Sequence, residues 1–377
     1  MAKEQAPTHY RALVLDRVGA DLRIEERTTP KALLGTVVVR VLASPVLSYQ
    51  RDICDGTRAY PFSPPIVSGC GAVCRVIAAG ADATTDVRHP GKLVWLDCVV
   101  RGRDDGDAVF LWGIHEGSSA GSRKLAREVW HDGTFAQVAR VPLENCVPLD
   151  EDRLCGGLGY KPEDLAYYLW HLSVPFGGLR SIDLKPGESV VVCPATGGFG
   201  GAGVHVAVAL GARVIAMGRS EDKLARLKKF ILEAIPSARI ETVRITGDQE
   251  ADAAALKTFG TIDAVLDLAP PEAAAAGSTH LLSAVSALRR GGRISIMGSV
   301  GVNIMGWEFL SNDLTARAKL MYDREDLLLF VKILEAGLFG RSKGLVETKL
   351  FELKDWREAL DEATTHTGVG RIVAFSP

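Results

Sequence analysis

The stretch VVVCPATGGFGGAGVHVAVALGA, residues 190–212, decides the fold. An apolar, β-branched run is followed by a glycine cluster and then by an Ala/Val-rich helical segment, the context in which such a cluster is informative. Side chains would block this tight turn and keep its backbone away from a pyrophosphate at the helix N-terminus. The alternative is close strand–helix packing without a ligand. The residues that we expect to contact a dinucleotide here are Thr196, Gly197, Gly198, Phe199, Gly200 and Gly201.

The segments after this turn alternate regularly between β-type and helix-type patterns. Such alternation predicts a parallel, doubly wound sheet, that is, an α/β fold with a Rossmann domain. The β-type runs cover residues 189–195, 213–218, 241–246, 263–269 and 293–298. Further candidates for cofactor contacts lie at the ends of the last two of these runs, at Ala269 and Gly298, and directly after the last one, at Ser299.

The end of the second β-type run indicates which cofactor is bound. Asp or Glu normally meets a free ribose 2′-hydroxyl there, whereas a 2′-phosphate needs cations and no carboxylate. The stretch VIAMGRSEDK, residues 214–223, favours NADP(H) over NAD(H). The alternative interpretation is a solvated helix start, with Glu221 or Asp222 competing for the cations. The candidate residues in this stretch are Gly218, Arg219, Ser220 and Lys223.

The region before the glycine turn has a different pattern. Short strand-like runs separated by Gly and Pro predict a β-rich domain, and the last residues offer a strand, a helix and another strand. We expect the chain to return to its first domain. The predicted domains are therefore residues 1–158 with 345–377, and residues 159–344.

The composition of the chain limits the kinds of molecule that it is expected to bind. The chain has 377 residues, and its 44 Lys and Arg against 46 Asp and Glu give a net charge of -2, so we expect no nucleic-acid partner. The N-terminus lacks a signal-like apolar region, and no segment approaches the roughly 18 apolar residues of a membrane span. We expect a cytoplasmic protein without a membrane partner. Seven cysteines spread along the chain favour reduced, mostly buried thiols over a disulfide framework.

The β-rich domain, the glycine turn and the returning C-terminal segment together resemble the medium-chain dehydrogenase/reductase superfamily. The stretches LKPGESVVVCPATGGFGGAG (184–203) and LRRGGRISIMGSVG (288–301) carry much of this resemblance. It implies a GroES-like first domain beside the Rossmann domain. The turn ATGGFGG is more similar to the quinone oxidoreductase and enoyl reductase branch than to the zinc alcohol dehydrogenases. Other stretches resemble fungal zinc-free members linked to secondary metabolism.

Zinc members of this superfamily carry a Cys ligand after the fourth strand and a Gly-His-Glu triplet in the next one. Here the first place reads SPVLSYQRD (44–52), without Cys or His, and the triplet aligns with Gly69, Cys70 and Gly71. Cys70 alone cannot provide the three protein ligands of an open catalytic zinc site, so we expect no metal. Cys70 and Cys74 are interpreted as small buried residues in a turn and strand, with a redox pair as the alternative.

The segment VLSYQRD (46–52) resembles the LNYKD-type segment of zinc-free relatives. The resemblance implies that Tyr49 hydrogen-bonds the substrate carbonyl or the cofactor ribose; the alternative is a core aromatic. We expect an NADPH-dependent reductase of an α,β-unsaturated carbonyl compound. The alternatives are a ketone or quinone reductase of the same superfamily and a non-redox nucleotide-binding protein. By the same resemblance, residues 314–326 are expected to pair two copies into a homodimer; the alternative is an internal strand.

Overall fold

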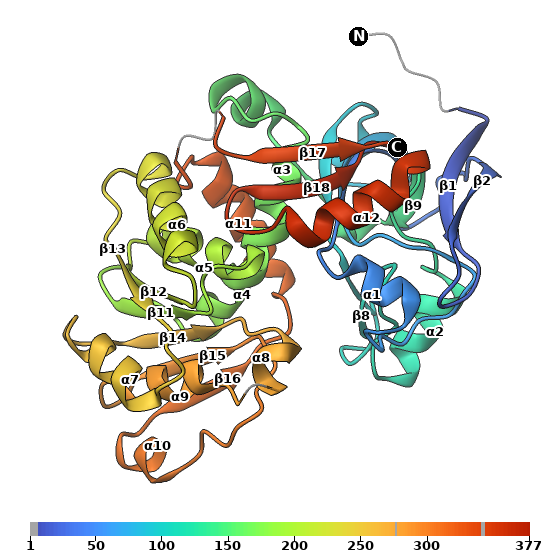
Figure 1. Cartoon of the computed structure of the whole chain (residues 1–377). Coiled ribbons are helices and arrows are strands. Elements are labelled where there is room, and N and C mark those ends of the chain that lie inside the picture. The colour runs from blue at the N-terminus through green and yellow to red at the C-terminus, as the bar shows by residue number, and fades with distance from the viewer. Residues whose placement is uncertain (1–6, 276, 341–343) are drawn as a thin grey trace. The chain divides into compact units, whose positions relative to one another are not determined.

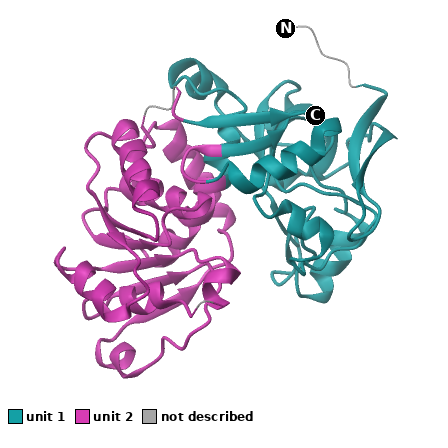
Figure 2. Ribbon diagram, viewed as in Figure 1, with its two compact units in different colours: residues 1–170, 346–367, 372–377 teal, residues 171–345, 368–371 magenta. Residues whose placement is uncertain are grey.

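The computed structural model describes residues 7–275, 277–340 and 344–377. The chain forms two compact units, shown in Figure 2. Unit 1 consists of residues 1–170, 346–367 and 372–377, and unit 2 of residues 171–345 and 368–371. Among the described helices, none has both the length and the apolar character needed to cross a membrane.

Unit 1 is built mainly from antiparallel sheet (Figure 1). Its largest sheet has the order β10-β6-β5-β3-β18-β17, with β9 also paired to β3, and a smaller sheet has the order β2-β1-β4. The strands are β1 (His9–Leu15), β2 (Leu22–Thr28), β3 (Thr36–Val46), β4 (Ile66–Val67), β5 (Ala72–Ala79), β6 (Leu93–Leu96), β7 (Val99–Arg101), β8 (Val109–Leu111), β9 (Val138–Pro142), β10 (Cys146–Pro148), β17 (Glu347–Phe351) and β18 (Arg371–Phe375).

The C-terminal segment completes the large sheet of unit 1. Strand β18 pairs antiparallel with β3, with Val373 opposite Val46. The short helices of this unit are α1 (Gln50–Asp55), α2 (Ala120–Glu128), α3 (Leu165–Tyr167) and α12 (Trp356–Thr365), with 3-10 turns η1 (Asp86–Arg88), η2 (Leu143–Asn145) and η5 (Leu353–Asp355).

The first segment of unit 1 extends beyond residue 158, where we expected it to end. The chain there forms π-helical turns η3 (Asp152–Gly157) and η4 (Tyr168–Leu172) around α3. Helix α3 packs against β3 and β5, and the rings of Tyr160 and Tyr168 meet edge to face with centroids 4.8 Å apart. These contacts hold residues 159–170 on the β-rich unit although their apolar spacing is helical.

Unit 2 contains a six-stranded parallel sheet with the order β13-β12-β11-β14-β15-β16. Its strands are β11 (Ser189–Cys193), β12 (Arg213–Gly218), β13 (Ile240–Arg244), β14 (Ala264–Asp267), β15 (Arg293–Ile296) and β16 (Thr315–Ala318). Its helices are α4 (Ser173–Ser181), α5 (Gly198–Ala209), α6 (Glu221–Ala234), α7 (Gln249–Lys257), α8 (Pro271–Ala275), α9 (Thr279–Ser286), α10 (Trp307–Ser311) and α11 (Arg324–Glu335). The predicted α/β fold, a β-rich domain with a doubly wound parallel-sheet domain, is confirmed.

Strands β11 and β14 are parallel neighbours at the centre of this sheet; β12 and β13 are added on the side of β11, and β15 and β16 on the side of β14, so the strand order reverses between β11 and β14. Helices α4, α5, α6 and α11 neighbour one another on one face, and α7 and α9 pack together on the other (Figure 1). In such sheets ligands bind beyond the carboxyl ends of the strands at the point of reversal. All five residues of β11 are buried, as its apolar sequence requires.

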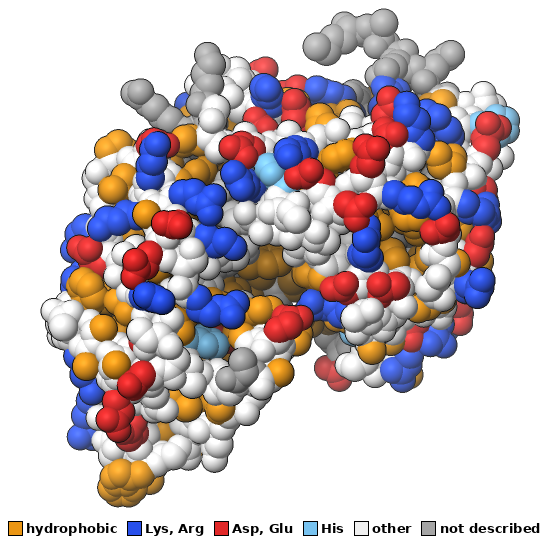
Figure 3. Space-filling view, viewed as in Figure 1, with side chains coloured by type: hydrophobic (Ala, Val, Ile, Leu, Met, Phe, Trp, Pro, Cys, Tyr) orange, Lys and Arg blue, Asp and Glu red, His pale blue; other side chains and the backbone are white. Residues whose placement is uncertain are grey.

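The surface agrees with the near-zero net charge. In Figure 3, acidic and basic side chains are interspersed over the visible faces of the units rather than gathered by sign. The seven cysteines all lie in the described residues and form no disulfide there, and all but Cys155 are buried.

Candidate active site

The glycine turn joins β11 to α5. Gly197 is the N-cap of α5, in the extended conformation with φ of −82° and ψ of 176°, and no side chain caps this helix end. A methyl group added at Gly197 would have no atom within 4 Å, so this glycine borders open space. An uncapped helix N-terminus beside open space is suited to an anionic group.

Three other predicted glycines are packed tightly. A Cβ atom at Gly200 would lie 2.0 Å from the backbone oxygen of Pro194, and one at Gly218 would lie 2.6 Å from Cγ2 of Thr196. At Gly201 it would lie 2.9 Å from Cβ of Val369. At these three positions, close packing by itself explains why the residue is glycine. Gly197 is not packed in this way, and it is the position that favours a ligand.

His171 lies beside the turn. Its ring centroid is 5.2 Å from that of Phe199, and its Nε2 atom is 3.1 Å from where a Cβ atom of Gly198 would be. Burial lowers the pKa of His171 to about 4, so the imidazole is neutral at pH 7. The histidine therefore shapes the turn by packing and adds no positive charge to it.

The end of β12 leaves two cations exposed. Arg219 and Lys223 make no ion pair with any residue that the structure describes. Glu221 instead faces Arg244, with 3.6 Å between their charged groups. The hydroxyl of Ser220 accepts a hydrogen bond from the backbone N–H of Lys223 at 3.3 Å, and so caps α6. Glu221 therefore faces Arg244 and does not pair with Arg219 or Lys223, the cations for which we considered it a competitor.

The remaining cofactor candidates meet at the ends of β14 and β15. The backbone N–H of Ser299 donates to the oxygen of Ala269 at 2.9 Å. Gly298 lies so close that an added Cβ atom would be 2.3 Å from the nitrogen of Ala269. The structure therefore brings Ala269 together with Gly298 and Ser299, which lie far from it in the sequence.

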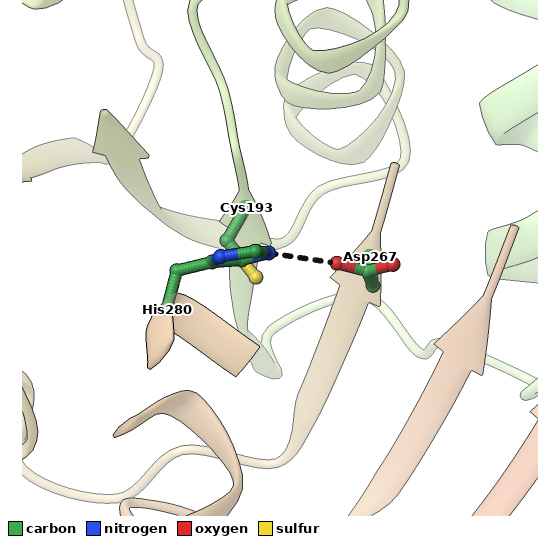
Figure 4. Close-up of side chains that lie close together, drawn as sticks. All are labelled: Cys193, Asp267 and His280. Carbon is green, nitrogen blue, oxygen red and sulfur yellow. Dashed lines mark hydrogen bonds and ion pairs between the residues drawn. The ribbon is translucent and has the colours of Figure 1, made fainter. Parts of the chain in front are cut away.

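A buried cluster supports this edge of the sheet (Figure 4). Asp267 ends β14 directly opposite Cys193, the last residue of β11. His280, from α9, lies with Nε2 3.2 Å from Oδ1 of Asp267. The other carboxylate oxygen is 3.5 Å from the backbone nitrogen of Ala269. Sequence reasoning missed this cluster, whose one signal was an acidic residue within an otherwise apolar strand.

The cluster has the residue types of a metal site, with ligand atoms within 4.8 Å of one another. Burial, and then the charge of Asp267, raise the pKa of the Cys193 thiol well above its ordinary value, so the thiol is neutral at physiological pH. The imidazole of His280 is already hydrogen-bonded to Asp267. The arrangement therefore fits a hydrogen-bonded support for the turn at Ala269 better than a metal centre.

Tyr49 lies in unit 1, at the residue that precedes α1. Its half-buried ring is 6.4 Å from that of Tyr60 in an edge-to-face arrangement, and the guanidinium carbon of Arg58 lies 3.9 Å from its centroid. Tyr60 in turn meets His115 at 5.1 Å. Sequence reasoning missed Arg58 and Tyr60; the signal available was GTRAYPF, residues 56–62, a cation and an aromatic directly after α1.

Desolvation raises the pKa of the Tyr49 hydroxyl well above its usual value near 10, and Tyr60 and Cys70 raise it further. The charge of Arg58 opposes this shift without reversing it. Tyr49 is therefore a neutral hydroxyl at physiological pH, able to donate a hydrogen bond to a carbonyl oxygen.

The two cysteines around which zinc was considered are buried, which confirms that part of their interpretation. Cys74 belongs to β5 and packs in the core of unit 1, and Cys70 lies in the preceding turn. Burial raises the pKa of both thiols well above the ordinary value. Both are neutral thiols at physiological pH, whereas attack in thiol–disulfide exchange requires a thiolate.

A small cavity lies next to the aromatic group that contains Tyr60 and His115. It has room for about one water molecule and is lined by Phe62, His115 and His131, among others. Nε2 of His131 is 2.8 Å from the backbone oxygen of Ser63, so this histidine is engaged by the backbone. The cavity is too small for a substrate.

No protein-family profile matches the chain. An alcohol dehydrogenase from Moraxella sp. strain TAE123 is 26% identical over 335 residues, covering 87% of this chain and 89% of that protein. An acryloyl-coenzyme A reductase from Metallosphaera sedula is 27% identical over 208 residues, 55% of this chain and 58% of that protein.

Solved structures share the fold. A thermostable alcohol dehydrogenase from Pyrobaculum aerophilum superposes with a TM-score of 0.72 at 22% identity, covering 98% of this chain and 100% of that one. A second structure of the Pyrobaculum enzyme, with cobalt and zinc bound, gives a TM-score of 0.71 at 21% identity, covering 98% of this chain and 100% of that one. At this level of identity the likeness establishes the fold.

Proposed function

We propose that this chain is a medium-chain dehydrogenase/reductase that reduces an α,β-unsaturated carbonyl compound with NADPH and without zinc. The open N-terminus of α5 at Gly197 carries the proposal, because packing explains its neighbours Gly200 and Gly201 but leaves Gly197 facing open space. Arg219 and Lys223, both exposed at the end of β12, are the groups proposed to bind the 2′-phosphate. Thr196, Phe199, Ala269 and Ser299 are proposed to complete the nucleotide site.

NADPH would supply a hydride to the β-carbon of the substrate. Tyr49 is proposed to donate its hydroxyl proton in a hydrogen bond to the carbonyl oxygen. The negative charge that develops on an enolate is shared between oxygen and carbon, so hydrogen-bond donors stabilise it without a Lewis acid. The high pKa of Tyr49 keeps this donor in its neutral form. Cys70 remains a thiol at the position where the resemblance aligns a zinc ligand.

Reduction of a ketone or a quinone is the second candidate. The similarity to an alcohol dehydrogenase along 87% of the chain favours it, since that name implies reaction at the carbonyl carbon. A nucleotide-binding protein without redox turnover is the third. The products separate the first two: a saturated carbonyl compound supports our proposal, and an alcohol or hydroquinone supports the alternative.

The first test is a fluorescence titration of the metal-analysed protein with NADPH and NADH in parallel. We expect saturable NADPH binding, weaker NADH binding and no stoichiometric zinc, followed by NADPH oxidation with an enone. Arg219→Ser should weaken NADPH binding about tenfold or more and leave NADH binding unchanged, because it removes a charge-assisted bond to the phosphate. Arg226→Ser, at an exposed position of the same helix α6, is the control.

Failure to bind either nucleotide would contradict the assignment of a nucleotide-dependent reductase. Binding of NADPH without oxidation by a broad panel of enones, ketones and quinones would favour the third candidate. Equal effects of Arg219→Ser on the two nucleotides would contradict the assignment of NADP(H).

The proposal extends to assembly and location. Strand β16 is the edge of the parallel sheet, and Leu320, just beyond it, is 68% exposed. Trp307 and Leu310 on α10 are also strongly exposed. We propose that two copies pair at this edge to form a homodimer. We propose a cytoplasmic enzyme of secondary metabolism, with unit 1, GroES-like in type, holding the substrate.

A further inference from the structure

Arg58 points to a feature of the substrate that the proposed reaction does not specify. We propose that Arg58 binds a carboxylate of the substrate, so that the protein acts on short unsaturated carbonyl compounds that carry an acid group. The inference rests on the proposed function for the identity of the reacting group. The anion site itself is argued only from residues of unit 1.

The position of Arg58 is set by its backbone and by two rings. Its backbone N–H donates to the backbone oxygen of Asp52 in α1 at 2.8 Å, and this bond fixes the course of the chain directly after that helix. Its guanidinium carbon lies 3.9 Å from the ring centroid of Tyr49 and 5.0 Å from that of Tyr60. The side chain is half-buried between these aromatic groups. Cation–π attraction therefore holds the cation in place.

Arg58 has no carboxylate partner in the part of the chain that the structure describes. Within 4.0 Å of its guanidinium, no acidic group lies among the residues that the structure describes. Two acids of this region have other partners: Asp55 accepts the backbone N–H of Thr57 at 2.8 Å, and Glu116, next to His115, pairs with Arg127 at 2.5 Å. Most partly buried arginines neutralise their charge with an acid, and this one leaves its charge available to a ligand.

The guanidinium of Arg58 has hydrogen-bonding capacity that the described chain does not use. A guanidinium that lies over a ring uses its face for that contact, while its N–H groups point outward in its own plane. Its Nε is buried and makes no hydrogen bond within the described chain. A carboxylate is planar and accepts two parallel N–H bonds from such an edge, whereas a neutral ester or amide gains much less. This favours a substrate carboxylate over a neutral polar group.

Arg58 also lies close to the proposed carbonyl-binding hydroxyl. Its charge acts on the hydroxyl of Tyr49 across the cation–π contact. A substrate whose carbonyl is bound by Tyr49 therefore places its acid group a few atoms away along its chain. The class that fits is a short keto-enoic or related unsaturated acid.

The test measures binding without turnover. We would titrate the full-length protein by calorimetry with 4-oxopentanoate, a saturated keto acid that cannot accept hydride at a C=C bond, and with its methyl ester. Wild-type protein should bind the acid about tenfold or more tightly than the ester. Arg58→Met, which keeps an apolar stem over Tyr49, should remove this difference, and Arg58→Lys should keep part of it. Arg17→Met, at an exposed position of the same unit, should leave it unchanged.

Equal binding of acid and ester by the wild-type protein, no detectable binding of the acid, or a preference that survives Arg58→Met would each overturn the inference. Thermal melts of the variants establish that they are folded, and Arg58→Lys provides a second variant of near-native size. Repeating the titration with NADP+ present tests the protein in its nucleotide-bound form.

A turnover arm separates this inference from the proposed function. With NADPH and 4-oxopent-2-enoate, we expect the KM of Arg58→Met to rise about tenfold or more while its KM for the methyl ester is unchanged. Acid-selective binding through Arg58 without NADPH oxidation would refute the reductase and leave the anion site intact. Reduction of acid and ester with equal KM by wild-type and Arg58→Met proteins would support the reductase and refute the anion site.

Discussion

The hydroxyl of Tyr49 is held in its neutral form, because desolvation and neighbouring groups raise its pKa above the ordinary value. If it binds the substrate oxygen, Tyr49→Phe should lower kcat for enone reduction about 100-fold, the usual loss when one donor to a developing oxyanion is removed. NADPH affinity should stay the same. Steady-state kinetics and a nucleotide titration measure the two effects.

Tyr10→Phe, a matched change at another tyrosine of unit 1, serves as the control for Tyr49→Phe. The raised pKa also means that wild-type activity should not fall through Tyr49 ionisation below about pH 10. A Tyr49→Phe variant with a lowered melting temperature but unchanged kcat would show that the residue is a structural aromatic.

His205 carries a pH-dependent contribution to stability. It is fully buried in α5 with Nε2 2.9 Å from the oxygen of Phe339, and burial lowers its pKa to about 4. Below the unfolded pKa of about 6.5, the unfolded chain binds a proton that the folded chain refuses, so stability falls with falling pH by about 1.4 kcal/mol per unit until about pH 4. Above pH 7 both states are neutral and the contribution vanishes.

We therefore expect His205→Gln to reduce the loss of stability between pH 7.5 and pH 5.5 by about 1 kcal/mol. Urea unfolding of the nucleotide-free protein at the two pH values measures this difference. His89→Gln, at an exposed histidine, should leave the pH dependence unaltered. An unchanged pH dependence in His205→Gln would mean that the buried imidazole is not the group responsible.

At the scale of elements, the glycines at the junction of β11 and α5 differ in whether the fold has room for a side chain: Gly197 has this room and Gly200 does not. Gly197→Ala places a methyl group in open space at an ordinary φ, so the melting temperature should change little. If a pyrophosphate approaches this backbone, the same methyl group should weaken NADPH binding about tenfold or more. Differential scanning fluorimetry and nucleotide titration measure the two effects.

Gly306→Ala is a closely matched control for that element. Gly306 is the N-cap of α10, has φ of −81° and ψ of −170°, and also borders open space. Its substitution should leave NADPH binding unchanged. Gly200→Ala, by contrast, should destabilise unit 2, because the new Cβ atom would lie 2.0 Å from the oxygen of Pro194. Unaltered nucleotide affinity in Gly197→Ala would contradict the proposed phosphate contact.

For the whole molecule, the testable property is assembly. The exposed Leu320 beside the edge strand β16 should be covered if two copies pair there. Leu320→Lys would then bury a charge in the interface and produce a monomer of 40.4 kDa instead of a dimer of twice that mass. Size-exclusion chromatography with light scattering measures this, with Leu34→Lys, at a leucine 74% exposed in unit 1, as the control. A wild-type monomer would refute the homodimer.

Sequence alone determined the class of fold and the location of the glycine turn. Both depend on local signals: buried β-branched strands at regular intervals, and glycine where a turn must pass close to other backbone. The return of the C-terminal segment to the first domain was also predictable, since its strand, helix and strand follow the last Rossmann strand. The boundary at residue 158 was less accurate, because α3 has helical spacing yet packs on β3 and β5.

Only the tertiary structure decided which side chains meet. Arg58 meets Tyr49 because the chain turns back after α1, and His115 meets Tyr60 because the loop after β8 packs beside the segment that follows α1. Cys193, Asp267 and His280 meet because parallel pairing sets β11 beside β14 in register and α9 packs against both. Periodicity records which face of an element is buried, but it carries no distance between elements. Those distances come from the long-range packing of the chain.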